Sequence, residues 1–144
     1  MSRGFSLAGL LRLRKLEEDE RAIVLNSARD RESIGVARTR RIRNSLADSP
    51  VDPLSYVSLV SVAATRATTA TMLAELGEAD RAAAAEVEEA RVAHADAHRR
   101  TKGLEKLETR FEEARTAEEL RAEQLVLDDL SARAWHISNP SGHA

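Results

Sequence analysis

Residues 76–114 read LGEADRAAAAEVEEARVAHADAHRRTKGLEKLETRFEEA. Alternate steps of three and four residues through this stretch give twelve positions, of which ten are apolar, whereas the other 27 positions hold only six apolar residues. An apolar spacing of 3.5 residues keeps a narrow stripe on one side of a helix, so the stretch is predicted to be a long helix packed against another helix. The twelve positions are Leu76, Ala79, Ala83, Glu86, Ala90, Ala93, Ala97, Arg100, Leu104, Leu107, Phe111 and Ala114.

Composition extends this prediction to the whole chain. Charged residues make up 32% of the 144 residues and aromatic residues 3%, while alanine and leucine supply most of the apolar content, which is typical of long helices and coiled coils. The absence of cysteine excludes disulfides and thiolate metal ligands, and fits a cytoplasmic protein. The predicted fold is all-α, an antiparallel two-helix coiled-coil hairpin with a longer second helix.

Prolines divide the chain into a first helix at residues 1–47, a turn at residues 48–53 and a second helix at residues 54–137, with a possible kink near Gly77 and a disordered tail at residues 138–144. Asp52 and Pro53 are typical of a helix start. The first helix is predicted to pack through apolar residues that are less regularly spaced than those of the second: Leu10, Leu13, Leu16, Ile23, Ile34, Ala37, Ile42 and Leu46.

Two registers of the helix pair are compatible with the sequence. A tight hairpin at Pro50 would place Leu13 opposite residue 88 and leave Leu104, Leu107 and Phe111 without an intramolecular partner. If instead residue i faces residue 117 − i, Leu13 faces Leu104 and the acidic residues 17–20 face residues 98–100. The second register leaves the apolar stripe that begins at Tyr56 without a partner, so the tight hairpin is favoured.

Two stretches suggest a family. The N-terminus reads FSLAGLLRLR at residues 5–14, followed by EEDERA at residues 17–22, and the later helix contains KGLEKLE at residues 102–108. Together, at this separation, they resemble the FliJ family of flagellar type III export proteins. The resemblance implies a stalk-like coiled coil that binds the ring of the export ATPase FliI, the membrane export gate protein FlhA and export chaperones. It also implies a cytoplasmic location, peripheral at the inner face of the cell membrane through these partners.

Carried onto this chain, the resemblance implies two binding surfaces. The gate contact would lie near the hairpin end, at Tyr56 and Leu59, where Leu59 replaces the usual aromatic residue. The ATPase contact would lie near the chain termini, at Phe5, Leu7, Leu10, Leu11, Arg14, Leu104, Glu105, Lys106 and Leu107.

Other features carry weaker functional signals. His94 and His98 have a spacing that can bind zinc, but the HExxH pattern and a third ligand are missing, so no metal or cofactor is expected. The arginines at positions 38, 40, 41 and 43 could bind an acidic partner or an anionic membrane, and nucleic acid is not expected because no aromatic platform accompanies them. No catalytic motif is present, so enzymatic activity is not expected. The alternative function is a self-associating structural coiled coil.

Overall fold

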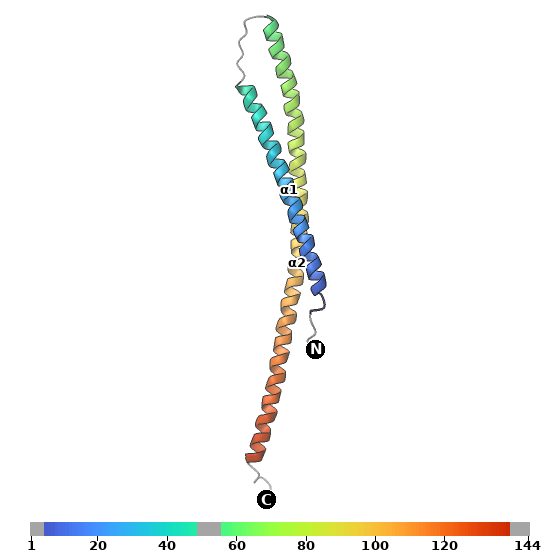
Figure 1. Ribbon diagram of the computed structural model, residues 1–144, viewed down its shortest axis with the longest axis vertical. Coiled ribbons are helices and arrows are strands. Elements are labelled where there is room, and N and C mark those ends of the chain that lie inside the picture. The colour runs from blue at the N-terminus through green and yellow to red at the C-terminus, as the bar shows by residue number, and fades with distance from the viewer. Residues whose placement is uncertain (1–4, 49–55, 139–144) are drawn as a thin grey trace. The chain divides into compact units, whose positions relative to one another are not determined.

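The structure is a computed structural model that describes residues 5–48 and 56–138. Two helices make up this part of the chain, α1 (Ala8–Ala47) and α2 (Tyr56–Ser138), and no strand occurs in it (Figure 1). The predicted all-α fold with a longer second helix is therefore confirmed. Asp52 and Pro53, the predicted start of the second helix, lie outside the described residues.

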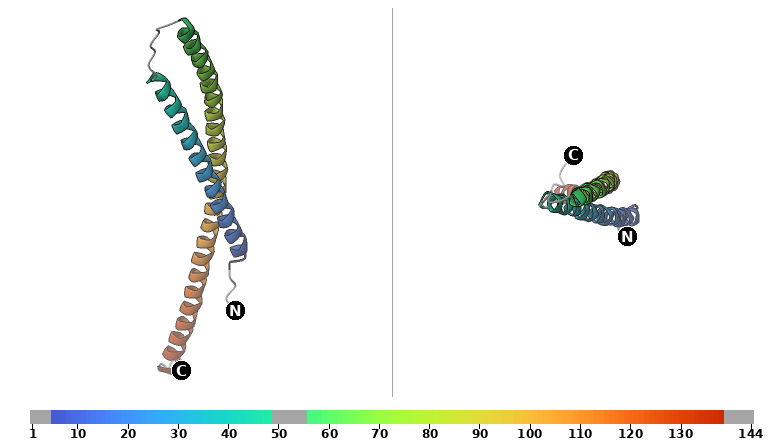
Figure 2. Two further views of the ribbon diagram at one scale, coloured as in Figure 1. Left: turned by 45° about the horizontal axis from the view of Figure 1, so that its top comes forward. Right: turned by 90° about the horizontal axis from the view of Figure 1, so that it is seen from above.

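The chain divides into two compact units. The hairpin unit consists of Arg14–Arg99, and the terminal unit combines Met1–Leu13 with Arg100–Ala144. Within the hairpin unit, α1 and α2 run antiparallel and lie side by side at their blue and yellow parts (Figures 1 and 2). They separate toward the teal end of α1 and the green start of α2.

The apolar core of the hairpin unit is small. Leu25, Ala28 and Ala90 are buried with 6%, 2% and 8% of their surfaces exposed, and Val87 packs against them. Since two of these three side chains are methyl groups, each contributing about 0.8 kcal/mol on burial, the apolar stabilisation of this pair of helices is modest.

Seven of the twelve predicted core positions of α2 are buried or half-buried, and four others are exposed while the residue that follows each of them is buried or half-buried instead. In the hairpin unit, Ala90 and Ala97 are buried as predicted, but Glu86 is exposed and the next residue, Val87, is half-buried in its place. Steps of three then four and of four then three are both compatible with a seven-residue repeat. Counting apolar residues favours the first order, whereas the structure uses the second, in which the polar core residue Asp80 pairs with Thr39 of α1. Residues at core positions in the observed order are Val62, Thr69, Leu73, Leu76, Asp80, Ala83, Val87, Ala90, His94 and Ala97.

The predicted face of α1 is wrong over most of its length. Leu16, Ile23 and Ile34 are 61–68% exposed. The face of α1 that packs against α2 has contact residues at seven-residue intervals. Some of these residues are polar, so a count of apolar residues selects the opposite side of the helix. Its buried and half-buried residues in the hairpin unit are Arg14, Glu17, Glu18, Ala22, Leu25, Ala28, Glu32, Gly35, Thr39, Ile42 and Leu46.

Polar contacts between the two helices establish the register. Thr39 Oγ1 donates to Asp80 Oδ2 at 2.8 Å, and Arg31 Nη2 donates to Glu86 Oε2 at 3.2 Å. The two residue numbers sum to 119 and 117, so residue i faces approximately residue 117 − i. The favoured tight hairpin is wrong and the staggered register is correct. A polar layer that pairs in only one alignment penalises slippage along an otherwise featureless run of alanines.

The stagger leaves the start of α2 without a counterpart on α1. In this register residues 56–69 would face residue numbers 48–61, which lie beyond the end of α1 at Ala47. Tyr56 is accordingly 81% exposed, and Val60 is 52% exposed. The buried and half-buried residues keep their seven-residue spacing through Leu76 and Ala83, so α2 passes Gly77 without a change of phase.

Gly35 leaves room for the polar layer. A Cβ atom added there would approach Asp80 Oδ1 to 2.9 Å, while that carboxylate accepts the Thr39 hydroxyl. We expect Gly35→Ala to lower the free energy of unfolding by about 1 kcal/mol, although the same exchange at an exposed helical site would raise it by a similar amount.

Urea denaturation followed by circular dichroism measures this difference. Gly9→Ala is the matched control because no atom lies within 4 Å of the Cβ at that site. Asp80→Ala added to Gly35→Ala should remove the penalty of the glycine exchange. A clear gain in stability from Gly35→Ala alone would contradict this packing.

One part of α2 is apolar enough to cross a membrane by length and composition. The helix contains an 18-residue window with a mean hydropathy of 1.2 and at most two charged residues, and none of that window is buried. The window lies at the start of α2, since residues 56–74 contain one charged residue, Arg66. The segment is a weak membrane signal by itself.

Candidate partner-binding surfaces

The terminal unit pairs the start of the chain with the middle of α2. The rings of Phe5 and Phe111 lie 5.7 Å apart at an interplanar angle of 49°, a tilted aromatic contact. Leu11 and Thr101 are buried in the same unit, with 5% and 2% of their surfaces exposed. Phe111, which the tight hairpin would have left unpaired, therefore packs against the N-terminal segment.

The predicted ATPase-binding residues of the terminal unit divide by exposure. Leu7, Leu10 and Leu107 are 37%, 38% and 46% exposed, large apolar side chains available to a partner. Lys106 is exposed beside Leu107, while Phe5, Leu104 and Glu105 are half-buried. Leu11 is buried, so it can support such a surface only by holding the helix in place.

Salt bridges within one helix hold the charged members of this predicted site. Glu105 accepts from Lys102 Nζ at 2.7 Å. Arg14 belongs to the hairpin unit, where its Nη1 donates to Glu17 Oε2 at 2.6 Å. Partly exposed pairs of this kind contribute little to stability, so both charges can be presented to a partner at little cost.

An apolar strip near the end of α2 was missed by the sequence interpretation. All residues from 112 to 138 are exposed, and five apolar ones follow one another at intervals of seven, three, four and three residues. The spacing itself was a detectable signal, but the strip lies beyond the point where the alanine-rich repeat ends. We name this the C-terminal strip, consisting of Leu120, Leu127, Leu130, Ala134 and Ile137.

The predicted gate residues lie at the start of α2 in the hairpin unit. Tyr56 and Leu59 are 81% and 48% exposed, and their spacing of three residues places them on neighbouring positions of one helical face. Both are therefore accessible, and the structure gives neither a polar contact with another described residue.

Histidine and glutamate side chains connect the two helices instead of forming a metal site. His98 Nδ1 lies 2.6 Å from Glu18 Oε1 on α1, and the His94 ring stacks at 6.4 Å from that of His98. Glu18 is half-buried and belongs to the acidic residues 17–20, which the staggered register places opposite residues 98–100. Within residues 5–48 and 56–138, no group of three His, Asp or Glu side chains could hold a metal ion.

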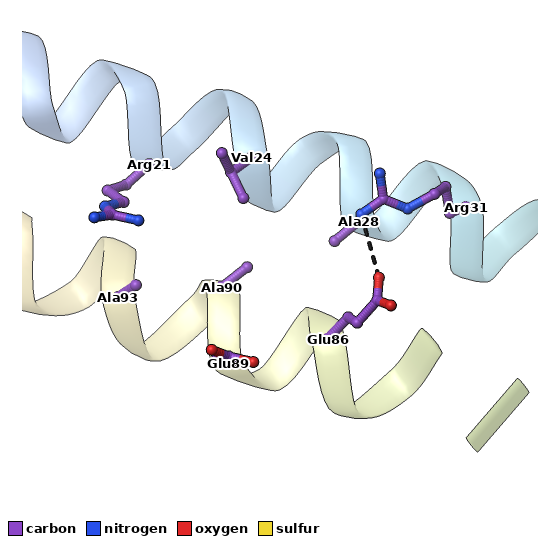
Figure 3. A pocket seen from close by; sticks show the side chains of 8 residues that line it. All are labelled: Arg21, Val24, Ala28, Arg31, Glu86, Glu89, Ala90 and Ala93. Carbon is purple, nitrogen blue, oxygen red and sulfur yellow. Dashed lines mark hydrogen bonds and ion pairs between the residues drawn. The ribbon is translucent and has the colours of Figure 1, made fainter. Parts of the chain in front are cut away.

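A groove between the helices of the hairpin unit has the dimensions of a packing defect. Its volume is about 260 Å³, below the roughly 300 Å³ at which small-molecule sites begin. Figure 3 shows Arg31 of α1 and Glu86 of α2 pointing toward each other across one end of it, with Ala28 and Ala90 between the helices. These side chains form an ion pair and an alanine layer, and the groove brings together no nucleophile and base.

Glu88 and Arg91 form an ion pair with shifted ionisation on the solvent side of α2. The Arg91 guanidinium donates two hydrogen bonds to Glu88, at 2.8 and 2.6 Å, and this hydrogen bonding holds the pKa of the Glu88 carboxyl below its usual value. The pair is local to one helical turn, so it has no bearing on the binding surfaces.

A family model for the flagellar FliJ protein matches residues 3–139. The chain belongs to the FliJ family. The match spans nearly the whole chain, including both helices and every residue of the surfaces above, and the resemblance found in the sequence is confirmed. No curated protein and no solved structure matches the chain.

Membership in the FliJ family makes this a coiled-coil protein of flagellar protein export, in a family of non-catalytic adaptors. The exposed surfaces, and not the groove, are then the parts of the molecule to consider for function. They comprise the leucines of the terminal unit, the C-terminal strip and the start of α2.

Proposed function

We propose that this FliJ-family chain is an adaptor of flagellar type III export that binds the export ATPase ring and the membrane export gate. The single observation that carries the proposal is the family match over residues 3–139. Its action is stoichiometric: the chain presents helix surfaces to larger partners and performs no chemistry of its own.

The ATPase surface in this proposal is the exposed apolar part of the terminal unit. Leu7, Leu10 and Leu107 supply contact area that no described part of the chain covers fully. Lys106 adds a positive charge at the same level of α2, and charged rims chiefly set association rate and specificity. The C-terminal strip extends the apolar area along α2.

The gate surface is the start of α2 in the hairpin unit. Tyr56 offers a large amphipathic side chain that is 81% exposed, and tyrosine is enriched where binding energy concentrates. Leu59 adds an aliphatic contact one turn later. Export chaperones are the third class of partner, and contacts with the gate would hold the chain peripherally at the inner face of the cell membrane.

A reconstitution with purified components tests the proposal. Adding the chain to the FliI ATPase of the same organism should raise ATP hydrolysis or ring assembly, and the chain should co-purify with FliI and with the soluble domain of FlhA. If it alters neither activity nor assembly and co-purifies with neither protein, the proposal fails.

A second candidate function is a self-associating structural coiled coil. The observation that favours it is the C-terminal strip, because a heptad-spaced apolar face can pair with its own copy. Sedimentation equilibrium separates the two: a tight dimer at micromolar concentration that Leu127→Asp disrupts supports self-association, and a monomer supports the adaptor.

A further inference from the structure

We propose that the free end of the hairpin unit binds directly to an anionic lipid bilayer, with residues 56–74 of α2 entering its acyl-chain region and the arginines of α1 holding lipid phosphates. This inference does not rest on the proposed function, since it requires neither the ATPase nor the gate.

The first argument is the distribution of apolar residues around the helix. Among the large side chains, Val57, Leu59 and Val60 are 76%, 48% and 52% exposed and point in different directions around α2. The alanines at positions 63, 64, 67, 70 and 74 are exposed as well. A helix that is apolar on all sides is found either in a protein core or in lipid, and this one is not in a core.

The second argument is that the threonine hydroxyl groups are hydrogen-bonded within α2 itself. Residues 56–74 contain four threonines, and each hydroxyl donates to the carbonyl four residues earlier, at 2.8–3.2 Å. Polar groups that are satisfied within their own helix cost less to remove from water than free ones. The segment can therefore leave water with few unpaired groups. The threonines are Thr65, Thr68, Thr69 and Thr71.

The third argument is charge. Between positions 36 and 47, α1 carries four exposed arginines and no acidic residue. The first acidic residue of α2 is Glu75. None of these arginines, nor Arg66, makes a hydrogen bond or ion pair with another described residue. Basic side chains beside an apolar helix favour binding to anionic lipid. Each arginine near the bilayer surface raises the affinity roughly fivefold. The four are Arg38, Arg40, Arg41 and Arg43.

The register brings the two features to the same end of the hairpin unit. Because Thr39 contacts Asp80, the arginine cluster lies level with residues 75–80, where the apolar segment ends and the acidic part of α2 begins. Residues 56–74 extend away from that level for about 28 Å. Arginines level with the end of an apolar helix are placed to bind the lipid phosphates at a bilayer surface.

An acidic protein surface would satisfy the arginines but not the helix. A docked protein covers one face of a helix in a groove, whereas here the apolar residues surround α2. The same end contains the proposed gate residues Tyr56 and Leu59, so a bilayer contact and a contact with a membrane-embedded gate would be neighbours.

Co-sedimentation of the full chain with lipid vesicles tests the proposal. The chain should bind vesicles of phosphatidylcholine with one-third phosphatidylglycerol, and binding should weaken as salt is raised. Arg40→Glu with Arg43→Glu, or Val57→Glu with Val60→Glu, should each reduce binding at least about tenfold. Equal binding to vesicles of phosphatidylcholine alone, or no binding to either, overturns the proposal.

Matched controls come from the terminal unit. Arg110→Glu with Arg121→Glu makes the same charge change at exposed sites of α2, and Leu125→Glu with Val126→Glu makes the same apolar-to-acidic change in another exposed apolar region, outside the C-terminal strip. Both controls should bind anionic vesicles like the unmodified chain. A loss equal to that of the hairpin variants would assign binding to the terminal unit or to net charge, against the proposal.

Fluorescence locates the contact independently. Trp135→Phe removes the single tryptophan, and Val60→Trp added to it places the reporter in the proposed segment. Its emission should shift to shorter wavelength with anionic vesicles and not with neutral ones. An emission that is unchanged while the protein sediments with the vesicles would show that the segment stays in water, and would overturn the proposal. Circular dichroism of every variant confirms that the helices are retained.

Discussion

Ala28→Asp should lower the free energy of unfolding by about 3 kcal/mol and remove much of the ordered structure of the hairpin unit. Ala28 is 2% exposed and belongs to the apolar cluster with Leu25 and Ala90. A carboxylate there would be desolvated between the helices, where the nearby Arg31 already pairs with Glu86, and the neighbouring alanine layer is too small to absorb the loss. Urea denaturation followed by circular dichroism measures the effect.

Ala37→Asp is the matched control for this change. Ala37 lies on the same helix, and the sequence interpretation assigned it to the packing face, but the structure exposes it. The control should change stability by less than about 0.5 kcal/mol. If the two variants are equally stable, or if Ala37→Asp is the worse, the observed face of α1 is incorrect.

If the chain stimulates the export ATPase as proposed, Leu107→Asp should abolish most of that stimulation, with at least a tenfold loss of affinity. Leu107 is 46% exposed in the terminal unit, and a charge at the centre of an apolar contact must be desolvated on binding. Titration of the variant into the ATPase, with hydrolysis and co-purification as readouts, measures the loss.

Val92→Asp is the control for the ATPase surface. Val92 is 45% exposed, lies on the same helix and belongs to none of the proposed surfaces. It should stimulate the ATPase like the unmodified chain, and both variants should retain the helical signal. Equal stimulation by Leu107→Asp and Val92→Asp would exclude Leu107 from the contact.

Sequence periodicity was sufficient to predict the helices but not the side on which α1 packs. Long runs of alanine and leucine with few prolines and glycines leave no alternative to two long helices. The packing face is a different matter, because Leu16 and Ile23 are more apolar than Glu18 and Gly35, which the structure places at the contact. An apolar count cannot detect polar residues whose partners are supplied by another helix.

The register was unpredictable for the same reason. An alanine-rich helix fits its neighbour in several alignments with similar apolar burial, and the alignment depends on pairs such as Thr39 with Asp80 and Glu18 with His98. Such pairs become visible only when both helices are in place. The candidate binding surfaces were predicted from the family resemblance, which rests on short motifs at residues 5–14 and 102–108. The structure then distinguishes Leu107, which is exposed, from Leu11, which is buried.

The staggered register underlies both the uncovered start of α2 and the layer at Gly35, and disulfide crosslinking tests it most directly. The chain has no cysteine, so a disulfide can form only between the two cysteines that are introduced. Thr39→Cys with Asp80→Cys should oxidise rapidly and nearly completely, because these side chains are in hydrogen-bond contact at 2.8 Å. Thr39→Cys with Val62→Cys, the pair that a tight hairpin would align, should remain reduced. Efficient crosslinking of positions 39 and 62, with none between 39 and 80, would contradict the account.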